Sequence, residues 1–240
     1  MWDKRAWREE EVESGSQMIT CKLCGINQDL DWFITAVYAS CDRNEKRDLW
    51  EELGAMRSLC EGPWVVCGDF NTIRFPSEKT NSMSDFSSCI NELELIDPPL
   101  FGGSYTWSGG ANYRNASRID RFLYSFPWDE MFTQIRQSSL PSLGSDHNPI
   151  LLTCGDGNFK KSYFKFEKWW LNVEEWSKEH KVNWKARKSH ILDQIGSLET
   201  LQESRPLNDD EQLVKAHLAM EYDEVARNEE IFWRQRSRVQ

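Results

Sequence analysis

The chain has 240 residues, with 29 Lys and Arg against 39 Asp and Glu, which gives a formal net charge of −10 at pH 7. Hydrophobic residues make up 39% and aromatic residues 12% of the chain, too many for a disordered protein and enough for one packed domain with an extension. The acidic balance excludes a protein that binds nucleic acid mainly through a basic surface, but it allows an enzyme that contacts nucleic acid at one local site.

The N-terminal residues carry mixed charge without a regular apolar pattern, and we expect a poorly structured segment over 1–17. No apolar run approaches the roughly 20 residues that cross a bilayer, and the start of the chain does not resemble a secretory signal. The 7 cysteines lack framework spacing, so we expect an intracellular protein of the nucleus or cytoplasm, not secreted and without a membrane partner. Cys21 and Cys24 form one Cys-x-x-Cys pair without the second pair that a zinc site needs, and we expect them on a strand.

Strand and helix patterns are mixed through the first two thirds of the chain. Short apolar and β-branched runs predict strands, and two single apolar stripes predict helices, the first of them N-capped by Asp42. This mixture indicates an α+β or α/β layered domain over 18–155. The expected strands are 18–24, 32–39, 64–67, 104–108, 118–124 and 150–153, and the expected helices are 42–60 and 84–95.

The composition changes in the last third of the chain. Residues 156–172 are dense in Tyr, Phe and Trp and are predicted to form an aromatic linker. Helical patterns follow at 173–204 and 208–240, with a break at Pro206. We therefore expect a helical connector over 173–240, a long charged hairpin or coiled coil that is capable of self-association.

The segment Gly68-Asp69-Phe70-Asn71 directly follows a predicted buried strand. Because side chains alternate along a strand, Asp69 and Asn71 should point the same way while Phe70 enters the core. A carboxylate and an amide that project together can hold a water and a phosphate oxygen, and the glycine permits close approach of the backbone to a ligand. A strand that simply ends in polar turn residues remains the alternative.

The predicted strand at 118–124 carries a second acid. Asp120 lies on the face opposite Ile119 and Arg121, and an Asp in an otherwise apolar strand requires a partner such as an imidazole. The alternative is a surface ion pair of Asp120 with Arg118 or Arg121, which would contribute little.

A third segment, Ser145-Asp146-His147-Asn148-Pro149, enters the last predicted strand. Its Asp can serve a cation and its His a phosphate or a proton, although a lone His is often structural. Together the three segments offer acid, amide and imidazole groups at strand ends. Hydrolysis of a phosphodiester needs an activated water and stabilisation of developing charge, and these groups supply part of both.

The segments GDFN (68–71), SRIDRFL (117–123) and SDHNP (145–149), in this order, resemble the endonuclease/exonuclease/phosphatase superfamily. The stretches "DWFITAVYA", "GPWVVCGDFNTIRFPSEK", "LIDPPLFGGSYTWS" and "SYFKFEKWWL" are similar to the endonuclease region of plant LINE-type retrotransposons, and "EEIFWRQRSRVQ" is similar to the connector before their reverse transcriptase. The resemblance implies an incomplete four-layer α/β/β/α sandwich followed by a helical hairpin. It also implies an ancestral Mg²⁺-dependent endonuclease that nicks DNA.

The same resemblance implies roles for single residues. Asp69 would orient and deprotonate the attacking water, and Asn71 would hold the water and the phosphate. Tyr38 matches the family tyrosine that touches the phosphate.

Further roles fall to the second and third segments. The imidazole of His147 would contact the scissile phosphate and be held by Asp120, and Asp146 would lie near the Mg²⁺ ion. The family's first-strand Asn and the following Glu, its main Mg²⁺ ligand, have no counterpart before Tyr38. We therefore expect an N-terminally truncated domain with weak Mg²⁺ binding and doubtful present activity.

Two other functions fit the sequence. A non-catalytic relic or interaction protein would use the helical tail to bind another chain. A phosphatase of the same superfamily would act on a small phosphorylated substrate.

Overall fold

A computed structural model describes residues 3–26, 29–75, 84–109, 115–155 and 184–237. The chain divides into a sheet unit, Met1–Leu140 with Asp146–Gly157, and a helical unit, Pro141–Ser145 with Asn158–Gln240. Within the described ranges, every helix is too short or too polar to span a membrane.

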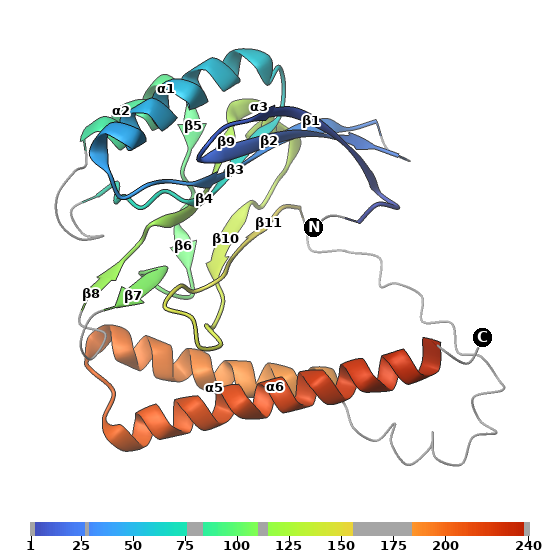
Figure 1. Cartoon of the computed structure of the whole chain (residues 1–240), viewed down its shortest axis with the longest axis vertical. Coiled ribbons are helices and arrows are strands. Elements are labelled where there is room, and N and C mark those ends of the chain that lie inside the picture. Colours follow the sequence, from blue (N-terminus) through green and yellow to red (C-terminus); the bar gives the residue numbers. More distant parts are fainter. Residues whose placement is uncertain (1–2, 27–28, 76–83, 110–114, 156–183, 238–240) are drawn as a thin grey trace. The chain divides into compact units, whose positions relative to one another are not determined.

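The main sheet of the sheet unit has six strands in the order β1-β2-β3-β4-β9-β5 (Figure 1). Strands β3 and β4 are parallel, whereas the other neighbouring pairs are antiparallel. The central strands β4 and β9 therefore place the end of one beside the start of the other. The strands are β1 (Trp7–Ser14), β2 (Met18–Gly25), β3 (Asp31–Tyr38), β4 (Trp64–Asp69), β9 (Asp120–Ser125) and β5 (Leu95–Ile96).

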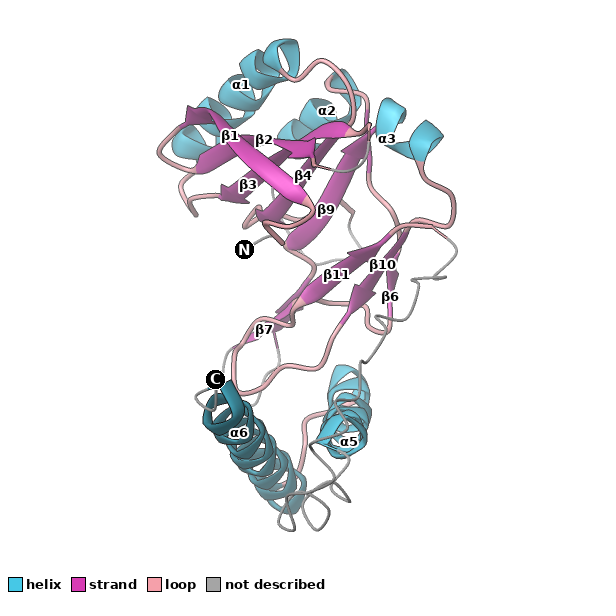
Figure 2. Cartoon of the chain, turned by 90° about the vertical axis from the view of Figure 1, so that its right-hand side faces the viewer, coloured by secondary structure: helices cyan, strands magenta, loops and turns pink. Residues whose placement is uncertain are grey.

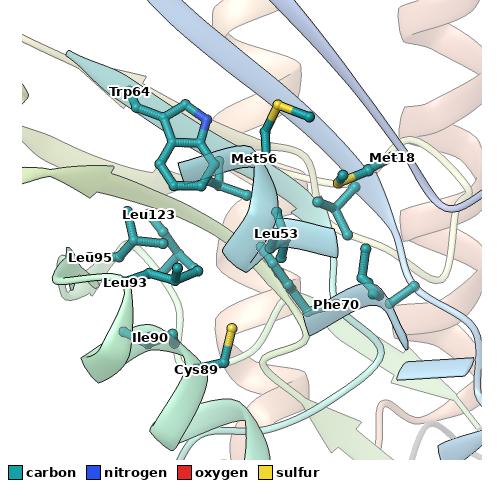
Figure 3. Close-up of a cluster of buried hydrophobic side chains, with 14 of the residues drawn as sticks. Met18, Leu53, Met56, Trp64, Phe70, Cys89, Ile90, Leu93, Leu95 and Leu123 are labelled. Carbon is teal, nitrogen blue, oxygen red and sulfur yellow. The ribbon is translucent and has the colours of Figure 1, made fainter. Parts of the chain in front are cut away.

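Helices α1 (Arg43–Leu59) and α2 (Ser84–Glu92) cover one face of the main sheet (Figure 1). The carboxylate of Asp42 caps α1 by accepting hydrogen bonds from the backbone N–H groups of Asn44 and Glu45. Apolar side chains from both helices and the sheet fill the space between them (Figure 3), and burial of each large one contributes roughly 1.5–3 kcal/mol. This core includes Met18, Leu53, Met56, Trp64, Phe70, Cys89, Ile90, Leu93, Leu95 and Leu123.

A smaller sheet of three strands, in the order β11-β10-β6, belongs to the same unit (Figure 2). A second apolar cluster contains Val65 of β4 and Tyr124 of β9, and Leu152 of β11 packs against it. A helical layer and two sheets thus follow one another, which confirms the predicted mixed α/β class. The remaining elements of this unit are β6 (Leu100–Phe101), β10 (Arg136–Ser139), β11 (Ile150–Thr153), the hairpin β7 (Trp107–Gly109) and β8 (Asn115–Ser117), and α3 (Phe126–Met131).

The helical unit contains α5 (Trp184–Ser204) and α6 (Asp209–Ser237), which lie side by side as a hairpin (Figure 1). Its apolar core is formed by Ile191 and Ile195 of α5 with Leu218 and Val225 of α6. The loop Pro141–Ser145 belongs to this unit, and the backbone N–H of Ser142 donates to the Glu199 carboxylate at 3.0 and 3.2 Å. The predicted helical tail is therefore present.

The N-terminus differs from its prediction. Residues 1–17 were expected to be poorly structured, yet Trp7–Ser14 form β1 and pair with β2. A solvated edge strand needs no alternating apolar pattern, and acidic side chains such as Glu9 and Glu10 protect such an edge from pairing with other chains. The sequence of β1 therefore shows no pattern that predicts a strand.

Two of the cysteines lie where the sequence predicts them, whereas part of the predicted tail is not described. Cys21 and Cys24 lie on β2 as expected, and all seven cysteines are free thiols. The predicted aromatic linker at 156–172 and the predicted helical residues 173–183 lie outside the described residues.

Candidate functional site

The end of β4 and the start of β9 bring two carboxylates together. Asp69 is the last residue of β4 and Asp120 the first of β9, and they are direct partners in the antiparallel register. Burial raises the pKa of the Asp69 carboxyl, and the charge of Asp120 adds to this increase. The N–H of Asn71 and the charges of His147 and Lys46 act in the opposite direction. Asp69 is thus held more basic than an ordinary aspartate.

His147 completes the group. Its Nδ1 lies 3.0 Å from Oδ2 of Asp120. The imidazole partner predicted for Asp120 is therefore His147 of the third segment. One ligand atom each from Asp69, Asp120 and His147 lie within 4.8 Å of one another, close enough to hold a metal ion. These three residues come from positions far apart in the sequence, and the main sheet and the loop before β11 bring them together.

The alternative partners of Asp120 are engaged elsewhere. Asp97, whose side chain is 1% exposed, accepts from Arg74 at 3.3 Å, Arg118 at 2.8 Å and Arg121 at 2.9 Å. Arg121 is fully buried on the core face of β9. The surface pair of Asp120 with Arg118 or Arg121 is therefore wrong.

Near its end, β4 lies unusually close to β3. Gly68 has φ +138°, and a Cβ there would lie 1.9 Å from the carbonyl oxygen of Val37 on β3. Only glycine fits this close contact between strands, so Gly68 allows β4 to pack against β3. Phe70 is fully buried, as the alternation predicted.

Asn71 lies in the left-handed region, with φ 45°. Its N–H donates to Oδ1 of Asp69 at 2.8 Å, and its Nδ2 donates to the carbonyl of Ala39 at 2.7 Å. Nζ of Lys46 donates to the carbonyl of Asn71 at 2.6 Å. Asn71 thus orients the Asp69 carboxylate, and its strained backbone is held by partners on two other segments.

Thr106 is a site residue that the sequence analysis missed. Its fully buried Oγ1 accepts from the N–H of Ile119 at 3.1 Å and of Asp120 at 2.9 Å. Its carbonyl accepts from the N–H of Asn148 at 2.7 Å. One residue therefore fixes both the start of β9 and the loop that carries His147. The contacts are non-local, and no local pattern could have revealed them.

Asp146 lies outside the group that Asp69, Asp120 and His147 form within the described residues. Its Oδ2 accepts from Nε1 of Trp107 at 3.0 Å, and its carbonyl accepts from the N–H of Ser108 at 2.9 Å. The other carboxylate oxygen, Oδ1, makes no hydrogen bond within the described part of the chain. Trp107, a second residue missed by the sequence analysis, thereby fixes Asp146 against β7.

Tyr38 ends β3 and is the register partner of Asp69. Its side chain is 75% exposed. The tyrosine therefore lies at the same edge of the sheet as the acids, with its ring open to solvent.

Comparison with known proteins adds a family match. The model of the Endonuclease/Exonuclease/phosphatase family matches residues 6–147. The match covers more than half of the chain and includes the first two segments and residues 145–147 of the third. No curated protein sequence matches the chain.

Solved structures are similar to part of the chain. The endonuclease domain of TRAS1, a telomere-specific non-LTR retrotransposon, aligns with a TM-score of 0.53 and 14% identity over 64% of this chain and 70% of that chain. A family protein from Bacteroides thetaiotaomicron aligns with a TM-score of 0.47 and 12% identity over 65% and 68% of the two chains. The Neisseria 3′ phosphatase NExo, solved with a product DNA hairpin, gives 0.42 and 17% over 57% and 65%. The TRAS1 alignment supports a shared fold.

Proposed function

The chain belongs to the endonuclease/exonuclease/phosphatase family, and from this we infer that its site hydrolyses phosphodiester bonds of DNA with a divalent metal ion. One observation carries the proposal: Asp69, Asp120 and His147 present ligand atoms within 4.8 Å of one another. The group combines a carboxylate of raised pKa with an imidazole that a second carboxylate orients. This is the arrangement of a base, an acid and a positioning group that hydrolysis requires.

Asp69 is the proposed general base. A carboxylate whose pKa is raised takes a proton from water more readily at neutral pH than an ordinary one. Asn71 is proposed to hold the water and the phosphate. Its Oδ1 makes no hydrogen bond within the described residues and can accept from the water, while the N–H of Nδ2 that does not donate to Ala39 can donate to a phosphate oxygen.

The phosphate would meet two further groups. Asp120 holds Nδ1 of His147, which fixes the ring so that Nε2 can donate to a phosphate oxygen. Tyr38, exposed at the same edge, is proposed to contact the phosphate through its hydroxyl.

The donors present suit a hard divalent ion such as Mg²⁺, which prefers carboxylate oxygens and usually takes one or two of them. Asp120 would hold the ion together with Oδ1 of Asp146, which leaves Asp69 free to act as the base. A bound ion would offset the negative charge that develops on the phosphate.

We expect this metal binding to be weak. The family glutamate that the resemblance implies as main ligand has no counterpart in the group, which contains no acidic residue ahead of Tyr38 among the described residues. Asp120 is also shared with His147. A retroelement origin, and with it DNA as substrate, is supported by the similar sequence stretches and by the fold shared with the TRAS1 domain. The free thiols fit the proposed location in the nucleus or cytoplasm.

The test is nicking of supercoiled plasmid by the purified chain with Mg²⁺, with Mn²⁺ and with a chelator. We expect slow, metal-dependent nicking, and a fall in kcat of about 10²–10⁴-fold in Asp69→Asn and in His147→Gln. Asp193→Asn and His190→Gln, on exposed positions of α5, are the matched controls and should keep full activity. Nicking that survives both the chelator and the site substitutions would reject the proposal. Release of phosphate from an inositol phosphate without any nicking would instead favour the small-substrate phosphatase.

A second candidate is self-association through the helical unit. Leu213 and Met220, one heptad apart on α6, are 69% and 72% exposed, and Val214 is 52% exposed. Light scattering tests this candidate: a dimer that Met220→Lys converts to a monomer supports it, and a monomeric native chain rejects it.

A further inference from the structure

Lys46 links the helical layer to the turn that carries the site. It lies in the first turn of α1, where its N–H donates to the carbonyl of Asp42 at 3.1 Å. Its side chain is half-buried and reaches a turn 25 residues further along the chain. Burial lowers the pKa of Lys46, and the charge of Asp69 acts in the opposite direction. A half-buried cation beside an acidic site calls for a functional explanation.

The receiving group is the carbonyl of Asn71, 2.6 Å from Nζ of Lys46. Asn71 has φ 45°, a conformation that a non-glycine residue keeps only when its surroundings fix it. Two bonds made by Asn71 itself, to Asp69 and to Ala39, fix its N–H and its amide. The hydrogen bond from Lys46 fixes the third polar group, the carbonyl of Asn71. Because the donor is charged, this bond is stronger than one from a neutral donor.

The turn in question orients the candidate base. The N–H of Asn71 donates to Oδ1 of Asp69, so any rotation of the Asn71 peptide would move the Asp69 carboxylate. The positive charge of Lys46 also partly offsets the charge of the Asp69 carboxylate. Both effects favour an ordered site that can accept a phosphate anion.

We propose that Lys46 is a positioning residue of the site, which fixes the Asn71 turn and thereby the Asp69 carboxylate. This inference rests on the proposed function for its catalytic consequence, but its structural part can be measured without activity. The matched pair of substitutions is Lys46→Met, which removes charge and donor, and Lys46→Arg, which keeps both. Arg47→Met, at the next and exposed position of α1, is the control.

The first measurement is hydrogen exchange of the backbone amides of residues 68–73 in the metal-free protein. We expect the Asn71 amide to exchange about tenfold faster in Lys46→Met than in the native chain. Lys46→Arg should restore most of the protection, and Arg47→Met should leave it unchanged. Equal exchange in Lys46→Met and in the native chain would overturn the inference.

The second measurement is plasmid nicking, well below the unfolding temperature of each variant. We expect kcat to fall at least about tenfold in Lys46→Met with KM changed less than about twofold, because positioning acts on the reaction step. Lys46→Arg should recover most of kcat. Unchanged kcat in Lys46→Met, or equal losses in Lys46→Met and Lys46→Arg, would overturn the catalytic part. If the native chain does not nick DNA, the proposed function fails, and the exchange result alone decides the role of Lys46.

Discussion

The sheet unit buries a cluster of charged side chains around Asp97, whereas two ion pairs of the helical unit, Arg187 with Glu221 and Arg205 with Glu211, are more exposed. In the sheet unit, Asp97 is 1% exposed and receives three guanidinium groups, one of them fully buried. In the helical unit, Arg187 pairs with Glu221, and their side chains are 52% and 30% exposed. The pair of Arg205 and Glu211 is similarly solvated.

Buried and exposed ion pairs differ in how much stability is lost when one partner is replaced. A buried polar group is costly unless all of its partners are in place, so the sheet unit tolerates few changes near its site. A solvated pair contributes little and can be lost without consequence for the fold. Substitutions in the sheet unit can be compared with matched substitutions at less constrained positions, with the free energy of unfolding as the measurement.

The largest effect is expected from Gly68→Ala. The added Cβ would lie 1.9 Å from the carbonyl oxygen of Val37, and φ +138° is unfavourable for alanine. We expect a loss of about 4 kcal/mol or more in the free energy of unfolding, measured by urea denaturation. Gly54→Ala in α1 is the control, because its Cβ would meet nothing within 4 Å. The control should gain about 0.5–1 kcal/mol. Similar stability of the two variants would contradict the strained contact.

A smaller but still large effect is expected from Asp97→Ala. This change removes the carboxylate that Arg74, Arg118 and Arg121 share, and removal of one member of a buried ion cluster costs about 3–5 kcal/mol. The matched change in the helical unit is Glu221→Ala, which should cost at most about 1 kcal/mol. Urea denaturation of both variants measures the difference. Equal losses would show that burial does not separate the two units.

The sequence predicted the strands that show an apolar or β-branched run and the helices that show an apolar stripe. Strands β2, β3, β4 and β11 and helices α1 and α2 lie close to their expected ranges. The edge strand β1 was missed because a solvated, charged edge strand shows no alternating apolar pattern, and β5 and β6, of two residues each, are too short to show any period.

The candidate site was predicted in part. The pairing of Asp120 with an imidazole followed from the cost of burying an acid on β9, and the structure supplies His147 as the partner. Thr106, Trp107 and Lys46 escaped prediction, because their contacts to the site join residues from distant positions. A Thr, a Trp or a Lys on a strand or helix carries no local sign of such a contact, so only the folded chain reveals it.

The smallest effect is expected in the helical unit, at the start of α6. Glu211 accepts hydrogen bonds from Arg205 and from the N–H of Asn208, and these bonds lower its pKa to about 2. A carboxyl whose folded pKa is depressed adds stability above its unfolded pKa, roughly 4.3, and this stability is lost as the pH falls through the folded value. We therefore expect the unfolding temperature of the native chain to fall more steeply between pH 4 and pH 2 than that of Glu211→Gln.

Calorimetry gives the unfolding temperature of the native chain and of Glu211→Gln across this pH range. Because both proteins share all other carboxyls, the difference between the two curves reports the titration of Glu211. Glu224→Gln, at an exposed position of the same helix, should follow the native curve at every pH. Because the pair of Arg205 and Glu211 is partly exposed, the gap between the curves should narrow when salt is added, since screening weakens exposed pairs. A gap that persists in high salt would mean that this solvated pair behaves like the buried charges of the sheet unit, and the contrast between the two units would then fail.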